Sequence, residues 1–163
     1  MLTGEQYLQS LRALKPEIYM FGEKIDTAVD SPILRPSVNS VKATYDLAQM
    51  PEHEDLMCAT SHLTGKKINR FCHIHQSTDD LIKKVKMQRL LGQYTAACFQ
   101  RCVGMDAMNA LYSTTFEIDR AHGTNYYDRF IKYLTYVQEN DLTVDGAMTD
   151  PKGDRGLTPA KQS

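Results

Sequence analysis

The chain has 163 residues, the length of one ordinary domain, and 42% of them are hydrophobic while 24% are charged. This composition is typical of a globular protein, and it excludes a disordered tail or a collagen-like repeat. The net charge of -1 gives no broad positive surface for nucleic acid, and no apolar run approaches the roughly 18 residues that a membrane-spanning helix needs.

The first part of the chain predicts helices with one short extended element. Residues 3–6 fit a capping box that starts a helix, and this helix is expected to end before Pro16. The aromatic and β-branched stretch 18–25 contains one glycine and indicates a small hairpin or an extended connector. A second helix is expected over 38–50, before a proline. Beyond it only one helical turn, at 54–57, is predicted before residue 76.

The longest helical pattern in the chain begins at a cap candidate followed by two aspartates and runs over 77–121. Apolar residues recur through it at helical spacing, and the periodicity continues through Cys98 and Cys102. We expect this helix to end at Gly123, and residues 124–125 to cap a further helix. The sequence therefore predicts a mainly α fold of antiparallel helices.

The last part of the chain, from residue 142, lacks the helical patterns of the preceding residues. A short extended piece over 142–148 precedes the loop 150–156, which carries two glycines and two cations. Such a loop suits the rim of a phosphate site, but the local pattern alone favours an exposed turn. The chain then stops without a closing helix or strand, so we expect a truncated product or one part of a split protein. The predicted organisation is a helical domain, 1–141, and the start of a β-domain, 142–163.

Two cysteines in the long helical pattern carry the most chemical interest. On a helix, Cys98 and Cys102 would lie on one face with Cβ atoms about 5–6 Å apart. Parallel side chains disfavour a disulfide but suit an iron–sulfur cluster, which accepts thiolates one helical turn apart. Spacing alone favours the alternative that both are small buried hydrophobes, against which the polar neighbours Gln100 and Arg101 argue slightly.

The remaining candidate ligands give a weaker signal. Cys72, His73 and His75 are cramped for one metal ion, so ordinary surface or half-buried residues are favoured over a zinc site. The N-terminus lacks the pattern of a secretory signal, and a reducing compartment keeps thiols free. We therefore predict a cytoplasmic protein without disulfides.

A family resemblance covers essentially the whole chain. The stretches that carry it, in order, are YMFGEKI, LRPSVNSVKATYDLAQ, HQSTDDLIKKVKMQRLLGQYTAACFQRCVGMDAMNALYSTTFEID, YVQENDL and VDGAMTDPKGDRGLTP. They resemble the N-terminal portion of the 4-hydroxybutyryl-CoA dehydratase family, which belongs to a flavoprotein group shared with 4-hydroxyphenylacetate 3-monooxygenase. The resemblance implies an acyl-CoA dehydrogenase-like fold, assembled as a homotetramer with FAD and a [4Fe-4S] cluster.

The resemblance also implies roles for particular residues. Cys98 and Cys102 would be two of the four cluster ligands, the others coming from a later part of the chain, and Gln100 would face the substrate pocket. The residues implied to contact the flavin are Met148, Thr149, Asp150, Pro151, Lys152, Gly153, Asp154 and Arg155.

The implied reaction converts the CoA thioester 4-hydroxybutyryl-CoA to crotonyl-CoA, together with isomerisation of vinylacetyl-CoA. In that family FAD takes part in one-electron oxidation of the substrate and the cluster acts as a Lewis acid on the leaving hydroxyl. Because residues 1–163 lack the other cluster ligands and most of the flavin pocket, we expect them to be inactive alone. Two alternatives stay open. One is a flavin-dependent hydroxylase of phenols, in which the cysteines only pack. The other is a non-catalytic helical assembly module with exposed apolar faces.

Overall fold

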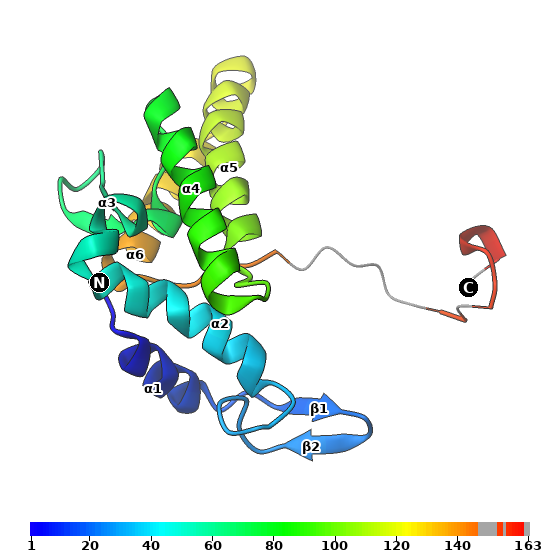
Figure 1. The fold of residues 1–163 in the computed structure, drawn as a ribbon. Helices are drawn as coiled ribbons and strands as arrows, with labels where there is room; N and C mark the ends of the chain where they lie inside the picture. Colours follow the sequence, from blue (N-terminus) through cyan, green and yellow to red (C-terminus); the bar gives the residue numbers. More distant parts are fainter. Residues whose placement is uncertain (147–152, 155, 162–163) are drawn as a thin grey trace.

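The computed structural model of the chain describes residues 1–146, 153–154 and 156–161. The elements follow in the order α1 (Gly4–Leu14), β1 (Ile18–Met20), β2 (Glu23–Ile25), α2 (Arg35–Asp46), η1 (Leu47–Gln49), η2 (Pro51–His53), α3 (Glu54–Met57), β3 (Cys58–Thr60), β4 (Lys67–Asn69), η3 (Arg70–Cys72), α4 (Thr78–Thr95), α5 (Arg101–His122), α6 (Tyr126–Asn140) and η4 (Pro159–Lys161). Helices dominate, and α4 and α5 stand side by side with α6 behind α5, above α1 and α2 (Figure 1). The predicted mainly α fold is confirmed.

The first helix begins as the sequence predicts. The Thr3 hydroxyl accepts a hydrogen bond from the Gln6 N–H at 3.2 Å, and the Gln6 side chain accepts one from the Thr3 N–H at 2.8 Å. This reciprocal capping box satisfies two backbone donors that the helix itself cannot pair. Tyr7 of α1 stacks on Tyr45 of α2 with ring centroids 4.8 Å apart, which fixes the two helices against each other.

Two antiparallel hairpins lie within the described residues. The predicted one pairs β1 with β2, and its turn places Phe21 and Gly22 at φ 53° and 83°. It projects from the helical body (Figure 1). The second, β3 with β4, was not predicted; each strand has only three residues, which is too short for an alternation of apolar and polar positions to stand out.

The connection between α5 and α6 differs from the prediction. Asn125 occupies the cap position of α6, but its side chain makes no capping hydrogen bond. The carboxylate of Asp119, near the end of α5, accepts the N–H groups of Tyr126 and Tyr127 at 2.9 and 2.8 Å instead. Asp119 also accepts the Thr124 hydroxyl at 2.6 Å, so one side chain of α5 caps the following helix.

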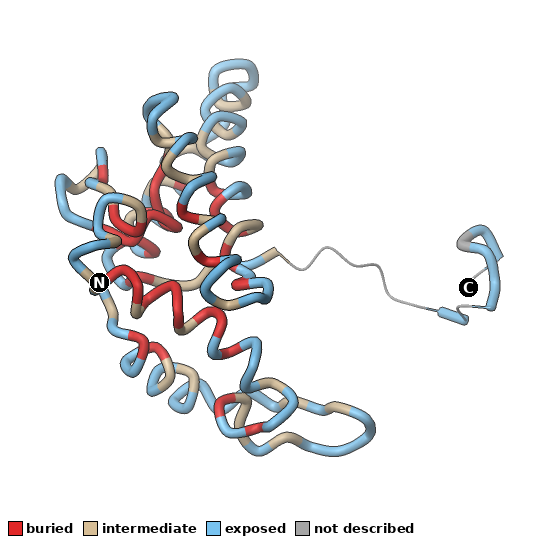
Figure 2. The backbone as a smooth tube through the Cα atoms, viewed as in Figure 1, coloured by how far each residue is buried: buried red, intermediate tan, exposed pale blue. Residues whose placement is uncertain are grey.

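The core consists of three packed groups of side chains. Buried residues follow the inner face of α2 and gather where α3 to α6 meet, whereas the far ends of α4 and α5 are exposed (Figure 2). The largest group joins α3, α4 and the start of α5 and comprises Leu47, Ala48, Met57, Cys58, Phe71, Met87, Leu91, Phe99 and Met105. A second joins β4, α5 and α6, and a third joins α1 to α2.

Large apolar side chains also remain exposed on the three long helices. They are Leu81, Ile82, Val85 and Tyr94 on α4, Leu111 and Phe116 on α5, and Tyr126, Tyr133 and Tyr136 on α6. Even so, among the residues described, no helix combines the length and the apolar character needed to cross a bilayer. Leu142 and Val144 pack on the second core group, and the predicted division between 1–141 and 142–163 stays a prediction.

Candidate functional site

The turn that carries the two candidate cluster ligands is not part of one long helix. The prediction of a continuous helix through Cys98 and Cys102 is wrong, because α4 ends at Thr95 and α5 begins at Arg101. Between them Ala96 and Gln100 adopt left-handed backbone conformations, with φ of 48° and 59°. The expectation that both thiols share one helical face falls with it.

A packing requirement explains this break. Phe99 and Arg101 are both buried, at 8% and 1% exposure. On an α-helix, residues two apart point in nearly opposite directions, so a straight helix would bury only one of these side chains. The turn is closed locally by Thr95, whose hydroxyl lies 2.8 Å from the Leu91 carbonyl oxygen and accepts a hydrogen bond from the Ala97 N–H.

The turn nevertheless presents two accessible thiols. Cys98 is exposed in the connection, and Cys102 is half-buried in the first turn of α5. Gln100 lies between them as the exposed residue before α5, and its side chain makes no capping hydrogen bond. Cys98, Gln100 and Cys102 therefore lie close together in the chain around one exposed turn.

The other two cysteines are packing residues. Cys58 lies in the largest core group, and its thiol is 3.4 Å from the Ala48 carbonyl oxygen. Burial raises the pKa of Cys58, and burial raises the pKa of Cys72 to about 11. Both side chains stay protonated at neutral pH, which makes them poor metal ligands.

Arg101 is the feature of this turn whose role the sequence did not disclose. Its guanidinium lies over the ring of Tyr45, with Cζ 4.5 Å from the centroid, and 5.0 Å from the centroid of Phe71. It donates to the Thr44 hydroxyl at 3.0 Å and to the Leu142 carbonyl oxygen at 3.2 Å. The hint in the sequence was the polar pair Gln100 and Arg101 inside a largely apolar run.

The segment that follows α6 lies along the first turns of α5. A methyl group on Gly104 would stand 1.9 Å from the Val144 carbonyl oxygen, so only glycine lets the two backbones approach this closely. Gly146 lies against Val103 in the same way, with a hypothetical Cβ 2.4 Å from a side-chain carbon. The described chain therefore reaches residue 146 beside the turn that carries Cys102.

The flavin-contacting stretch predicted for Met148 to Arg155 lies mostly outside the described residues, since 148–152 and 155 are not described. Gly153 and Asp154 are described and exposed, and the Asp154 carboxylate accepts a hydrogen bond from the Gly156 N–H at 2.8 Å. The predicted flavin contacts therefore stay a prediction.

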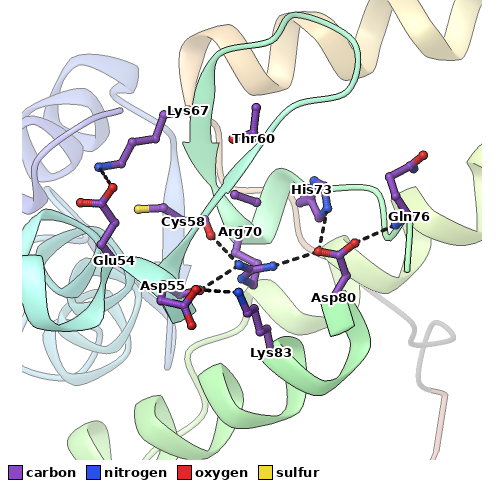
Figure 3. A pocket seen from close by; sticks show the side chains of 11 residues that line it. Glu54, Asp55, Cys58, Thr60, Lys67, Arg70, His73, Gln76, Asp80 and Lys83 are labelled. Atoms are coloured by element: carbon purple, nitrogen blue, oxygen red, sulfur yellow. Dashed lines mark hydrogen bonds and ion pairs between the residues drawn. The ribbon is translucent and has the colours of Figure 1, made fainter. Parts of the chain in front are cut away.

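A separate polar groove of about 510 Å³ lies between α3, the β3–β4 hairpin and the start of α4. Figure 3 shows the Arg70 guanidinium at its centre, directed toward the Asp80 carboxylate. Arg70 approaches Asp80 at 3.3 Å and donates to the Cys58 carbonyl oxygen at 2.6 Å. Across the same groove Lys67 pairs with Glu54 at 2.8 Å. Lys83 pairs with Asp55 at 2.6 Å, so opposite charges in the groove neutralise one another.

The histidines beside the groove do not form a metal site. His73 Nε2 lies 3.2 Å from Asp80, and burial lowers the pKa of His73 despite that carboxylate. Burial also lowers the pKa of His75. Within residues 1–146 and the shorter described stretches after them, no three His, Cys, Asp or Glu side chains are grouped so that they could hold a metal ion. The expectation of surface or half-buried residues here holds for His75, which is half-buried, but not for Cys72 and His73, which are buried.

The family profile described as 4-hydroxyphenylacetate 3-hydroxylase N terminal matches residues 3–163. The chain belongs to this hydroxylase N-terminal family.

Within the family, the similarity to dehydratases is much stronger than the similarity to hydroxylases. The 4-hydroxybutyryl-CoA dehydratase/vinylacetyl-CoA-Δ-isomerase of Clostridium aminobutyricum is 66% identical over 99% of this chain and 33% of the relative. A solved oxygen-tolerant archaeal 4-hydroxybutyryl-CoA dehydratase from N. maritimus is 54% identical, with a TM-score of 0.88 over 98% of this chain and 32% of that one. The 4-hydroxyphenylacetate 3-monooxygenase oxygenase component of Thermus thermophilus is 24% identical over 98% of this chain and 32% of the relative.

A solved 4-hydroxyphenylacetate 3-monooxygenase oxygenase component, complexed with FAD and 4-hydroxyphenylacetate, shares the fold of this family member. Its TM-score is 0.71 at 20% sequence identity, over 99% of this chain and 33% of that one. The chain thus spans about one third of the length of the relatives that it matches. The described residues therefore supply at most part of the site that such relatives build.

Proposed function

We propose that residues 1–163 act as the N-terminal domain of an FAD- and [4Fe-4S]-dependent enzyme that dehydrates 4-hydroxybutyryl-CoA to crotonyl-CoA and isomerises vinylacetyl-CoA. The observation that carries this proposal is the 66% identity to a 4-hydroxybutyryl-CoA dehydratase over 99% of the chain. The structural similarity to an archaeal dehydratase, at 54% identity, supports it.

Two thiols of this chain fit a share of the cluster site. Cys98 and Cys102 are free and accessible on one exposed turn, whereas Cys58 and Cys72 are buried. We assign Cys98 and Cys102 as cluster ligands, with the remaining ligands outside the described residues. When bound, the cluster supplies a Lewis-acidic iron and FAD supplies one-electron chemistry.

The chain's own contribution is binding and orientation. Phe99 and Arg101, which lie between the two cysteines in the chain, are buried, so the turn is anchored to the core between Cys98 and Cys102. Gln100 keeps an exposed amide in the same turn, and we assign it to hydrogen bonding with the substrate. Met148 to Arg155 are assigned to flavin contacts on the family resemblance. Gly146, the last residue described before them, lies against Val103 of α5.

Assembly and location belong to the same proposal. We assign a homotetramer, and the exposed apolar side chains on α4, α5 and α6 support a further protein surface covering them. A cytoplasmic location accords with four free cysteines.

The test is anaerobic production of the complete enzyme, that is, residues 1–163 together with the downstream portion that the relatives have. We expect a brown, oxygen-sensitive protein that contains FAD and forms crotonyl-CoA from 4-hydroxybutyryl-CoA. Cys98→Ser and Cys102→Ser should each lose the cluster and the dehydratase activity, while Cys58→Ser should keep both. A colourless, iron-free protein after anaerobic reconstitution contradicts the proposal.

A second function, flavin-dependent hydroxylation of a phenol, is favoured by the family profile and by the fold shared with a monooxygenase component. The two functions separate in one assay with reduced flavin, oxygen and 4-hydroxyphenylacetate. Formation of the hydroxylated phenol by an iron-free protein supports hydroxylation, and its absence supports the dehydratase.

A further inference from the structure

Arg101 is a buried cation placed between the two proposed cluster ligands in the chain. Its side chain is 1% exposed, although arginine is almost never fully buried without partners. A buried guanidinium needs hydrogen-bond acceptors around it, because its removal from water costs several kcal/mol of free energy unless such partners offset it. Its contacts show which parts of the domain hold it.

The partners of Arg101 come from three separate segments. From α2 come the Thr44 hydroxyl and the ring of Tyr45, and from η3 come the ring of Phe71 and the Cys72 thiol at 3.8 Å. The third segment follows α6. There Arg101 Nη2 donates to the Leu142 carbonyl oxygen and lies 3.6 Å from the Asp141 carboxylate, itself buried.

Asp141 is in turn fixed by other parts of the chain. Its carboxylate accepts the Leu2 N–H at 2.9 Å, and its carbonyl oxygen accepts the Tyr45 hydroxyl at 3.0 Å. The same hydroxyl lies 2.8 Å from the Thr143 hydroxyl. Residues 141–143, which follow α6, therefore contact both Tyr45 of α2 and Arg101 of α5.

We infer that Arg101 is a positioning residue that holds the turn of Cys98 and Cys102 and the segment 141–146 in one fixed arrangement. Since 141–146 leads directly into the stretch assigned to flavin contacts, this link fixes the cluster ligands relative to the flavin. The second half of the inference rests on the proposed function. The first half rests on the contacts of Arg101 alone.

The link is tested first on the chain itself, by hydrogen–deuterium exchange of Arg101→Met. Methionine keeps an unbranched side chain but removes every donor and the charge. We expect the amides of 98–104 and of 141–146 to exchange about tenfold faster while those of α6 stay as in the wild type. Arg120→Met, on the same helix, is the matched control, since the Arg120 guanidinium lies over the exposed Phe116 ring of α5, 5.7 Å from its centroid, and not in the core. Wild-type exchange in either segment of Arg101→Met overturns the inference.

The consequence for catalysis is tested on the complete enzyme loaded with iron and FAD. Arg101→Met should keep both cofactors and a KM within about threefold of the wild type. Its kcat should fall roughly 10- to 100-fold, the scale expected for a misplacement of about 1 Å. The electron paramagnetic resonance signal of its chemically reduced cluster should also change in shape. An unchanged kcat with an unchanged signal overturns the inference. If the wild-type enzyme itself holds no iron, the proposed function fails, and the exchange experiment still decides the link.

A second pair of variants covers the case in which Arg101→Met does not fold. Asp141→Asn and Thr44→Val keep the shapes of their side chains, and each removes one contact of Arg101. We expect each to raise exchange in both 98–104 and 141–146, by less than a fully removed guanidinium would. Wild-type exchange in both variants overturns the inference.

Discussion

Gly104 lies against the backbone of Val144 so closely that a methyl group on Gly104 would stand 1.9 Å from the carbonyl oxygen. Neither backbone can yield easily, because Gly104 is inside α5 and the segment around Val144 packs on the core. We expect Gly104→Ala to lower the free energy of unfolding by about 1–3 kcal/mol, the usual cost of overpacking. Urea unfolding followed by circular dichroism measures this change.

Gly92 provides the matched control for that substitution. It is also a glycine within a helix, but a Cβ there meets nothing within 4 Å. Gly92→Ala should therefore raise the free energy of unfolding by about 1 kcal/mol, through the better helix propensity of alanine. Equal effects of the two substitutions would show that residues 141–146 do not pack on α5 as described.

Asp80 should make stability depend on acid pH. Burial alone would raise the pKa of Asp80, but hydrogen bonds from the Gln76 N–H and Ser77 and the nearby His73 outweigh it and lower the pKa to about 2. A carboxylate whose pKa is depressed in the folded state stabilises the fold above its unfolded pKa, and that contribution fades as pH falls through the folded value. We expect Asp80→Asn to cost about 2 kcal/mol near pH 7.

The pH profile of that cost is the decisive part of the measurement. The difference between wild type and Asp80→Asn should persist down to about pH 5 and shrink between about pH 4 and pH 2. Asp79→Asn is the control, since this neighbour in the same turn is exposed and its ion pair with Lys83 should contribute less than about 1 kcal/mol. A cost that vanishes already at pH 6 contradicts the assignment of Asp80 as the titrating group.

The four thiols should react in a defined order with a thiol-specific reagent in the native protein. Cys98 is exposed and Cys102 half-buried, whereas Cys58 and Cys72 are buried. We expect fast labelling of Cys98, slower labelling of Cys102, and labelling of the other two only after unfolding in urea. Mass spectrometry of the labelled peptides measures the order. Labelling of Cys72 before Cys102 is incompatible with the described core.

Asp119, rather than Asn125, should be the residue that caps α6. Asp119→Ala removes the acceptor for two backbone N–H groups, so the urea midpoint should fall and the helix start should fray. Asn125→Ala should change the midpoint by less than half as much, because its side chain makes no capping hydrogen bond. The opposite ranking of the two variants contradicts the described connection.

Local signals in the sequence predicted much of the fold. The capping box of α1, the β1–β2 hairpin and the start of α4 at Ser77 all depend on residues that are neighbours in the chain, and each was predicted correctly. The break between α4 and α5 could not be predicted this way. It arises because Phe99 and Arg101 both enter a core built by α2, η3 and residue 142, which are distant in sequence.

The candidate site likewise combines residues that local sequence can indicate with one whose role depends on residues distant in the chain. Cys98 and Cys102 could be singled out from spacing and from family resemblance, which needs no knowledge of packing. The role of Arg101 depends on partners at positions 44, 45 and 141, and no local pattern connects them. Cys98 itself was placed on the wrong type of element, since the apolar periodicity continues through the turn without a breaker residue.

Iron and acid-labile sulfide in the anaerobically reconstituted complete enzyme test the central assignment most directly. We expect the wild type and Cys58→Ser to contain the same amounts of iron and of sulfide per protein. Cys98→Ser and Cys102→Ser should each lose both iron and sulfide while remaining folded, as judged by circular dichroism. A folded Cys98→Ser or Cys102→Ser protein with the wild-type content of iron and sulfide would contradict that assignment.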